Sequence, residues 1–341
     1  MNDILKYFYH KWFNYTDKWH PFLSVYYLTY ACDFRCPYCS DGSKRPYYAL
    51  PAEVLPGKSV ISLIEKIRSH CDYLVITGGE PLNHPDFEYI MQRIGKLRFK
   101  QIVLTTNGYD LDIYLSVITA NIHSLVISLD ALDHTKADAW YGIGKGSLKK
   151  IISNINLAAN QPGRKYEMLI SSVVTPENIN DLYDVYHFAK QNNCTFAACP
   201  QLVGVKAHAS LTDNPDYKQF YDFLIAEKQK GGPVYGSLLY LEYMKNFNKF
   251  TCYPFTMLVV SPTGDVFYPC LEIGNLAENL LENNYLHQIR LNAKNKFGSQ
   301  PDCGRQCHSA CALGFSLILT YPFSIFNELY LMLKQKLKTL S

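Results

Sequence analysis

Short apolar runs alternate with stretches of helical periodicity from about residue 25 to residue 200. One such run, at 73–77, is almost continuously apolar, as strands buried on both faces of a parallel sheet are. The pattern predicts strands at 25–30, 73–77, 101–106, 124–129, 166–174 and 195–199. It predicts helices between them at 59–69, 86–97, 110–120, 147–160 and 177–192.

This alternation predicts an α/β protein with a parallel sheet and right-handed crossovers, curled into a partial barrel. Farther along the chain, Gly231-Gly232-Pro233 indicates a break, and residues 252–311 are turn-rich and cysteine-rich. The predicted divisions are an N-terminal amphipathic helix at 1–21, the barrel at 22–205, a linker or helical segment at 206–250, a small cysteine-rich subdomain at 251–312 and an apolar, amphipathic segment at 313–341.

Both ends of the chain combine apolar and basic residues. Residues 4–19 mix aromatic side chains with lysines, and residues 327–340 place leucines among lysines. The apolar run at 312–326 is interrupted by Pro322 and is shorter than the roughly 20 residues that a membrane-spanning helix needs. The two ends are therefore predicted either to lie on an anionic membrane surface or to pack on the barrel as capping helices.

Composition narrows the possible functions. Of the 341 residues, 48% are hydrophobic and 18% are charged, which is typical of a folded globular protein. The formal net charge of +3 does not favour nucleic-acid binding, which needs a strong and clustered basic excess. Because no secretory signal peptide is evident, we predict a cytoplasmic protein, with peripheral membrane contact if its ends bind a membrane.

Three of the eleven cysteines, Cys32, Cys36 and Cys39, follow the first predicted strand with the spacing C-x3-C-x2-C. Three thiolates on one short loop can hold three corners of a cubane iron–sulfur cluster, and one iron then stays open for a small molecule. The alternatives are a zinc site, which needs a fourth ligand such as His20, and a disulfide, which an odd number of cysteines disfavours. Cys71, Cys194 and Cys199 are isolated in apolar surroundings and are predicted to be buried.

Polar residues follow the next predicted strands at the point where each strand ends. The segments are 77–81 (TGGEP), 105–108 (TTNG) and 128–130 (SLD). Each one alone could be a turn or a helix cap. Because carboxyl ends of parallel strands meet at one end of a barrel, together they predict an active-site rim beside the cysteine loop. Two glycines allow close backbone approach to a ligand, and Glu80 could accept an ammonium group.

At these residues the chain resembles the radical S-adenosylmethionine (radical SAM) superfamily, over roughly residues 22–200. The resemblance implies a partial TIM-type (β/α)6 barrel with a [4Fe–4S] cluster on the catalytic cysteines Cys32, Cys36 and Cys39. The open iron would take the amino and carboxylate groups of SAM. The residues that the resemblance assigns to the cofactor site are Tyr38, Gly78, Gly79, Glu80, Pro81, Thr106, Asn107, Ser128, Asp130 and Val174.

The implied reaction is reductive. One electron, from a small donor such as a flavodoxin or ferredoxin, splits the sulfonium C–S bond, and a 5′-deoxyadenosyl radical abstracts hydrogen from the substrate. The chain departs from the family in one place, because residues 138–142 lack the arginine that many relatives use for the SAM carboxylate. Lys145 or a backbone donor would have to replace it.

The later cysteines resemble the SPASM/twitch extension of the same superfamily. The resemblance implies an auxiliary [4Fe–4S] cluster, with one thiol to spare, and a hairpin turn at Gly264. A zinc site is the alternative, because C-x3-C spacing also suits zinc. The candidate ligands are Cys252, Cys270, Cys303, Cys307 and Cys311.

Two classes of substrate fit these features. SPASM enzymes often modify peptides, but only about 24 residues precede the first strand, so a leader-binding domain would be a separate protein. The amphipathic ends, and a loose similarity to hopanoid-modifying radical SAM enzymes, favour a lipid or another membrane-associated molecule. The remaining alternative is an iron–sulfur scaffold or electron carrier without enzymatic activity.

Overall fold

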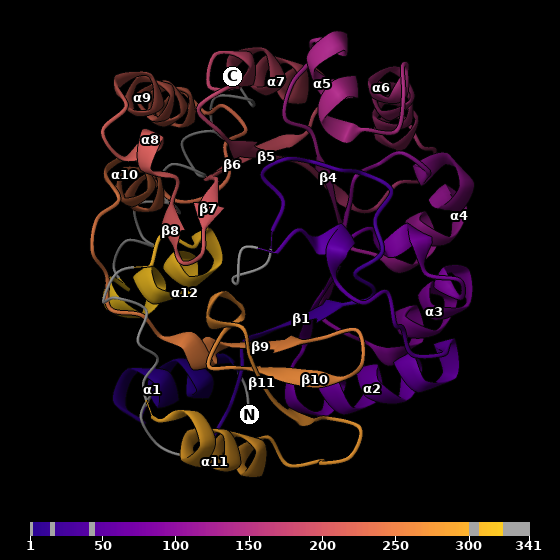
Figure 1. Cartoon of the computed structure of the whole chain (residues 1–341), viewed down its shortest axis with the longest axis vertical. Helices are drawn as coiled ribbons and strands as arrows, with labels where there is room; N and C mark the ends of the chain where they lie inside the picture. The colour runs from indigo at the N-terminus through magenta and orange to yellow at the C-terminus, as the bar shows by residue number, and fades with distance from the viewer. Residues whose placement is uncertain (1–2, 14–17, 41–44, 300–306, 323–341) are drawn as a thin grey trace, which may run out of the picture.

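The computed structural model describes residues 3–13, 18–40, 45–299 and 307–322. Six parallel strands stand side by side in the order of the sequence, which confirms the predicted partial barrel (Figure 1). Neighbouring strands keep a regular register, with Val25 opposite Val75 and Val75 opposite Val103. The strands are β1 (Leu23–Tyr27), β2 (Tyr73–Thr77), β3 (Gln101–Thr106), β4 (Ser124–Ser128), β5 (Glu167–Val174) and β6 (Thr195–Pro200).

Helices cover the outer face of this curved sheet (Figure 1). They lie within a few residues of the predicted positions and bury one apolar face, as α2 does with Val60, Leu63 and Ile67. The helices are α2 (Gly57–His70), α3 (Phe87–Ile94), α4 (Leu111–Asn121), α5 (His134–Tyr141), α6 (Ser147–Ala159) and α7 (Asp181–Gln191). Helix α5 was not predicted, although Asp133 caps its start and Gly142 ends it in a left-handed conformation.

The sheet continues beyond the predicted barrel. Strand β9 (Met257–Val260) pairs in parallel with β1, and β10 (Asp265–Tyr268) and β11 (Asn275–Asn279) extend the sheet antiparallel. The sheet therefore has nine strands in the order β11-β10-β9-β1-β2-β3-β4-β5-β6. The expected hairpin turn lies at Gly264, whose φ is 98°. The cysteine-rich segment thus shares its sheet with the barrel.

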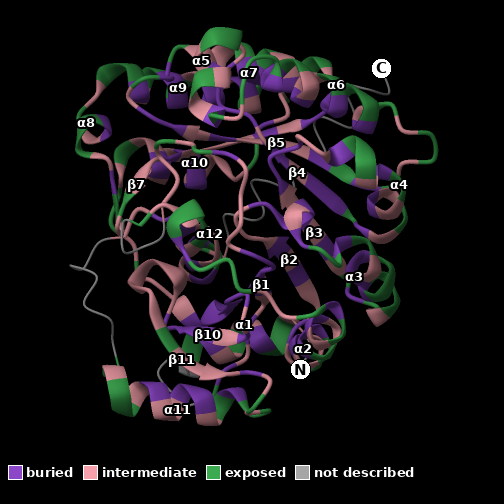
Figure 2. Ribbon diagram, turned by 45° about the vertical axis from the view of Figure 1, so that its right-hand side comes forward, coloured by how far each residue is buried: buried purple, intermediate pink, exposed green. Residues whose placement is uncertain are grey.

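The remaining elements lie around the sheet, and Figure 2 shows buried and intermediate residues along its strands. A short hairpin, β7 (Leu202–Val203) and β8 (Lys206–Ala207), follows β6. The other helices are α1 (Asp3–Phe13), α8 (Ala209–Thr212), α9 (Pro215–Gln229), α10 (Leu238–Asn246), α11 (Leu286–Phe297) and α12 (Ala310–Thr320). The 3-10 helices are η1 (Tyr47–Ala49), η2 (Pro81–Asn83), η3 (Gly95–Leu97), η4 (Pro254–Thr256) and η5 (Leu271–Ile273).

The two ends of the chain are described only in part. Among the described helices, none has both the length and the apolar character that crossing a bilayer requires. Helix α1 packs against α12, and Lys6, which belonged to the predicted basic set, is buried. The leucine-rich segment at 327–340 lies outside the described residues.

Candidate functional site

The Arg35 side chain stabilises the loop that carries Cys32, Cys36 and Cys39 through hydrogen bonds to its backbone. The Arg35 guanidinium donates hydrogen bonds to the backbone carbonyls of Cys32, Asp33 and Phe34, at 2.7, 3.0 and 2.9 Å. The Asn83 amide, from the segment after β2, donates to the Asp33 carboxylate. The loop is therefore folded by the protein's own contacts. This role of Arg35 was not predicted from the sequence.

The glycine pair after β2 packs directly on this loop. A Cβ atom at Gly78 would lie 2.2 Å from the Thr29 carbonyl oxygen, and one at Gly79 would lie 2.4 Å from the Ala31 carbonyl oxygen. The Gly79 N–H donates to Thr29 and the Glu80 N–H donates to Ala31, both at 2.8 Å. The two glycines are needed here because backbone meets backbone. This contact holds the end of β2 against the cysteine loop.

Glu80 is bound by protein groups. Its carboxylate accepts hydrogen bonds from the Leu82 N–H at 3.0 Å, the Thr106 hydroxyl at 2.7 Å and the Asn107 N–H at 2.6 Å. Burial raises the pKa of Glu80 to about 7, although these three hydrogen bonds act in the opposite direction. Pro81 follows as the first residue of η2. Glu80 therefore fixes the end of β3 relative to β2, and the ammonium contact expected of it stays a prediction.

Asp130, after β4, joins Tyr38 of the cysteine loop to β5. One carboxylate oxygen accepts from the Tyr38 hydroxyl and the other accepts from the Val173 N–H, at 2.7 Å for the latter. Burial raises the pKa of Asp130 to about 6, and these two hydrogen bonds oppose the shift. The side chain of Tyr38 is thus fixed by Asp130. The predicted contact with adenine concerns the backbone of this residue and is not tested.

The side-chain directions on β5 change one of the residues predicted to line the site, Val174. Side chains alternate between the two faces of a strand, and on β5 this alternation puts Ser171 and Val173 on the cavity side. Val174 is fully buried in the hydrophobic core. The structure therefore places Val173, and not the predicted Val174, on the cavity side of β5.

One cavity of about 440 Å³, called here the central cavity, brings the predicted residues together. Cys32, Cys36, Cys39 and Tyr38 line one wall. The strand ends contribute Thr77, Gly78, Gly79, Thr105, Thr106, Asn107, Ser128, Asp130, Ser171 and Val173. The cavity has the size of a typical small-molecule site and lies at the carboxyl ends of the strands, as predicted.

The lining offers groups that suit the expected cofactors. The Asn107 side-chain nitrogen is buried without a hydrogen-bond partner, while its oxygen accepts from the Tyr109 N–H at 2.9 Å. A buried donor without a partner is costly, so this nitrogen suits an oxygen atom of a bound ligand. Backbone at Gly78 and Gly79, the buried Asp130 carboxylate and an apolar Val173 complete a site that can hold an adenosyl group and an amino acid.

The three thiols also suit iron. Burial raises the pKa of Cys32 to about 12 and that of Cys39 to about 11, so a bound cation is needed to keep them ionised at neutral pH. Within the described ranges, no group of three His, Cys, Asp or Glu side chains is arranged around a single metal position. A cubane cluster has a different requirement, because each thiolate binds its own iron atom.

A further part of the central cavity's lining consists of residues that were not predicted to belong to the site. They are Cys199, Glu272, Ser309, Ala310 and Cys311. Cys199 was predicted to be a buried small side chain, as Cys71 and Cys194 indeed are, but it faces the cavity. Burial and then the neighbouring Cys311 raise the pKa of Cys199 to about 12. No motif marks this part of the lining, because its members come from three distant segments.

The late cysteines divide into two sets in the structure. Burial, Glu272 and then the neighbouring Cys252 and Cys270 raise the pKa of Cys307, so these three sulfur atoms lie in one region. Among the described late cysteines, only Cys311 lines the central cavity. Cys303 lies outside the described residues. The structure thus collects three of the five candidate ligands and places Cys311 at the cavity.

The missing arginine has no replacement at the predicted place. Lys145 is exposed, and Asp138 caps α6 by accepting from the Leu148 N–H at 2.8 Å and the Ser147 hydroxyl at 2.7 Å. Among the described residues that line the central cavity, none is a lysine or arginine. Asn107 is therefore the better candidate for an oxygen of the SAM carboxylate.

Comparisons with known proteins agree with this geometry. Residues 26–189 match the family described as the radical SAM superfamily. The chain is 31% identical over 173 residues to a GTP 3',8-cyclase of Synechocystis sp., a match that covers 48% of this chain and 49% of that protein. It is 34% identical over 176 residues to the enzyme of the same name from Campylobacter jejuni, with 48% and 50% covered. The chain spans about half the length of the curated relatives it matches.

Solved structures of SuiB from Streptococcus suis share the fold. SuiB bound to S-adenosylmethionine aligns with a TM-score of 0.60 and 17% identity, over 78% of this chain and 64% of that chain. SuiB bound to its precursor peptide SuiA aligns with a TM-score of 0.62 and 17% identity, over 83% and 66%. Residues 26–189 of the chain therefore match the radical SAM superfamily, and this match implies a [4Fe–4S] cluster and S-adenosylmethionine as cofactors.

Proposed function

We propose that this protein is an enzyme that cleaves SAM reductively and abstracts hydrogen from a substrate in the central cavity. The observation that carries the proposal is that one cavity unites Cys32, Cys36 and Cys39 with the carboxyl ends of β2 to β5. When bound, the cluster and SAM supply a 5′-deoxyadenosyl radical, with the electron coming from a small donor such as a flavodoxin or ferredoxin.

The protein's own residues position the cofactors and limit solvent access. Arg35 and the glycine pair hold the cysteine loop, and Glu80 holds Asn107 at the end of β3. Asn107 donates to an oxygen of SAM, and Val173 packs on its adenine. Asp130 fixes the ring of Tyr38 beside the cavity. These contacts preorganise the site, which reduces the loss of freedom when SAM binds.

The composition of the central cavity bears on the substrate. The GTP 3',8-cyclases match this chain over only about half of its length, so the match supports the shared SAM chemistry more than a shared substrate. A triphosphate would need cationic partners, whereas the described lining contains the carboxyl groups of Asp130 and Glu272 and no lysine or arginine. A substrate without phosphate groups at its reacting end, such as a peptide or a lipid, fits this cavity better.

We also propose an auxiliary [4Fe–4S] cluster on late cysteines. Cys252, Cys270 and Cys307 supply three neighbouring thiols, and Cys303 is the fourth candidate ligand. Four cysteine ligands are usual for such a cluster. In this assignment Cys311 is the spare thiol, because it lines the central cavity.

The decisive experiment is SAM cleavage by anaerobically reconstituted, reduced protein. We expect 5′-deoxyadenosine and methionine to form, measured by liquid chromatography with mass spectrometry. The scaffold or electron-carrier alternative predicts an intact cluster spectrum without 5′-deoxyadenosine. That result would remove the enzymatic proposal.

A further inference from the structure

A second cavity, called here the apolar cavity, lies beside the central one. Its volume is about 330 Å³. Its walls come from β1, β9, α12 and the segment at 235–240, and most of its lining side chains are apolar, including Leu23, Met257, Phe315 and Leu317. Two further lining residues, Tyr235 and Ile318, are exposed, so the cavity opens to the surface.

The two cavities meet at the start of α12. Ala310 and Cys311 line both of them, whereas the other lining residues belong to one or the other. The two cavities therefore adjoin at Ala310 and Cys311, which form part of the wall of each. The polar part of the composite site is at the strand ends, and the apolar part opens at the side of the barrel.

Gly314 borders open space on the α12 wall of the apolar cavity. It lies on α12 and lines the cavity, and a Cβ atom built on it would meet no heavy atom within 4 Å. A glycine inside a helix destabilises the helix relative to alanine. At this position the missing side chain leaves a volume that no described protein atom fills.

Helix α1 buries polar side chains and exposes apolar ones, which is the reverse of an ordinary surface helix. Its buried side carries Lys6, which donates to the carbonyls of Pro21 at 2.6 Å and His70 at 3.2 Å, and His10. Its outer side carries the stripe Ile4, Phe8 and Trp12, which are 68%, 42% and 68% exposed. The spacing of four residues puts these three side chains on one face. Exposed apolar faces of this kind mark contacts with an apolar partner or a membrane.

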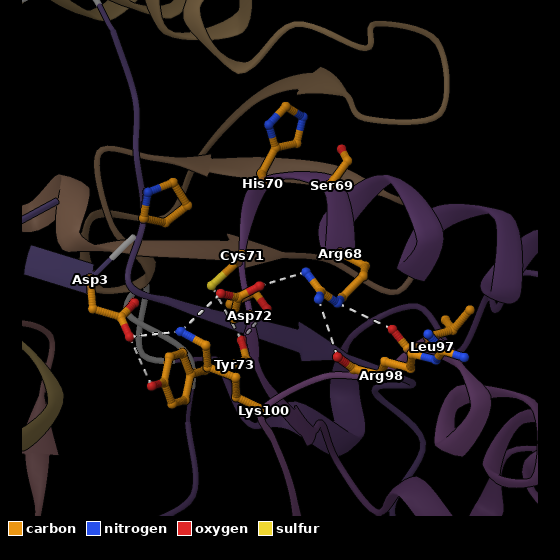
Figure 3. A network of polar contacts seen from close by, with 12 residues as sticks. Asp3, Arg68, Ser69, His70, Cys71, Asp72, Tyr73, Leu97, Arg98 and Lys100 are labelled. Carbon is orange, nitrogen blue, oxygen red and sulfur yellow. Dashed lines mark hydrogen bonds and ion pairs between the residues drawn. The ribbon is translucent and has the colours of Figure 1, made fainter. Parts of the chain in front are cut away.

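Polar contacts also anchor the start of α1. Figure 3 shows the Asp3 carboxylate bound to the Lys100 ammonium group and the Tyr73 hydroxyl, at 2.9 and 3.1 Å. Lys100 in turn pairs with Asp72 at 3.2 Å, and Asp72 pairs with Arg68. This network, together with Lys6, holds the polar side of α1 on the barrel. The apolar stripe therefore faces outward as a consequence of how the helix is attached.

The stripe and the apolar cavity are linked through α12. The Lys11 ammonium group of α1 donates to the Leu319 carbonyl of α12 at 3.0 Å. Phe315, which lines the apolar cavity, stacks on Phe22 with ring centroids 6.1 Å apart, and Phe22 in turn meets His10 of α1. The exposed lysines Lys11 and Lys18 flank this region and suit an anionic lipid surface.

We propose that the substrate is a membrane lipid whose long apolar chain occupies the apolar cavity, so that its reacting end reaches the central cavity past Cys311. The stripe Ile4, Phe8 and Trp12 seats the protein on the bilayer from which the lipid enters. This assignment rests on the proposed function, because it names the substrate class of the same radical site. It selects the lipid over the peptide alternative on the basis of the apolar lining of the second cavity and the two residues that it shares with the central cavity.

The first test fills the apolar cavity. Dansyl-labelled undecanoic acid serves as the probe, and its fluorescence is titrated with the reconstituted protein. We expect the wild type to bind it, Gly314→Phe to lose at least about tenfold in affinity, and Gly314→Ala to keep it, because alanine leaves most of the volume open. Equal affinity of wild type and Gly314→Phe, or displacement by an apolar peptide but not by phospholipid, overturns the lipid assignment.

SAM cleavage in the same proteins separates this inference from the proposed function. Gly314→Phe should still form 5′-deoxyadenosine in the absence of substrate, because the substitution lies outside the cysteine loop and the strand ends. This result also shows that the variant folds. If the wild type forms no 5′-deoxyadenosine, the proposed function fails, whereas loss of probe binding alone concerns the lipid assignment.

The second test addresses the stripe. Full-length protein is floated with vesicles of phosphatidylglycerol and phosphatidylcholine. We expect the wild type to float, the double variant Phe8→Ser with Trp12→Ser to stay in the dense fraction, and Ile113→Ser to float. Ile113 is the matched control, since it is 63% exposed on α4, away from the apolar cavity. Absence of flotation by the wild type, or equal flotation of both variants, contradicts the proposal.

Discussion

The early cysteines, Cys32, Cys36 and Cys39, lie on one loop, whereas the late cysteines come from separate segments of the chain. The early loop is closed by Arg35 and packed against the glycine pair at the end of β2. Cys252 precedes β9, Cys270 follows β10, and Cys307 precedes α12. The early group is thus a local structure supported by the barrel, and the late group exists only when three segments have come together.

This difference predicts different consequences for the loss of a cysteine. A local loop can lose one ligand and keep its fold, so that the chemistry alone is lost. Ligands from three segments also connect those segments, so that losing them affects both iron content and stability.

The largest effect is expected for the early loop. Cys36→Ser should abolish formation of 5′-deoxyadenosine, because the SAM-binding cluster loses one of its three ligands. Iron content and product are measured on the same sample. The control is Cys194→Ala, since Cys194 is buried in the barrel core away from the central cavity. Substantial SAM cleavage by Cys36→Ser would contradict the assignment of this loop.

The late group should behave differently. Replacing Cys252, Cys270 and Cys307 together by serine should lower the iron content from about eight to about four atoms per chain, as one of two [4Fe–4S] clusters is lost. SAM cleavage should persist at a reduced level, and the melting temperature should fall. Unchanged iron content would show that these thiols hold no cluster and would leave the early loop as the iron site of the chain.

Glu80 connects the early loop to β3 and should make stability depend on pH. Burial raises its pKa from 4.5 to about 7, so the folded state binds the proton more tightly than the unfolded state. This contribution to stability is complete below about pH 4.5 and is lost as the pH rises through about 7, on the order of 3 kcal/mol in total. Chemical denaturation across this range measures it. Glu80→Gln should lack this slope, and an identical slope in the variant would rule Glu80 out as its source.

The smallest effect is expected at Arg35. Arg35→Ala removes the donor shared by three backbone carbonyls of the early loop, and water replaces part of these contacts because the side chain is exposed. We expect a loss of about 1 kcal/mol in the free energy of unfolding and slower cluster reconstitution. Arg164→Ala is the control, since that guanidinium packs on Tyr166 and has no hydrogen bond to the early loop among the described contacts. Equal reconstitution rates would mean that the loop forms without Arg35.

Much of the barrel was predictable from the sequence, because strand and helix periodicity are local properties. Strands β2 and β3 lie at the predicted residues, and the spacing of Cys32, Cys36 and Cys39 by itself predicts a cluster-binding loop. The pairing of β9 with β1 was not predictable in this way, because it joins residues more than two hundred positions apart. The burial of Lys6 was also missed, since its partners are the backbone carbonyls of Pro21 and His70.

The sequence by itself determined the early cysteine loop, the order of strands and helices, and the resemblance of the barrel to the radical SAM superfamily. These features depend on residues that are close along the chain, so their spacing carries the information. Only the tertiary structure decided that Cys311 lines the central cavity, that Val173 rather than Val174 faces it, and that an apolar cavity adjoins it. The physical reason is that a cavity wall is assembled from distant segments, and which side chain faces it depends on packing and strand direction.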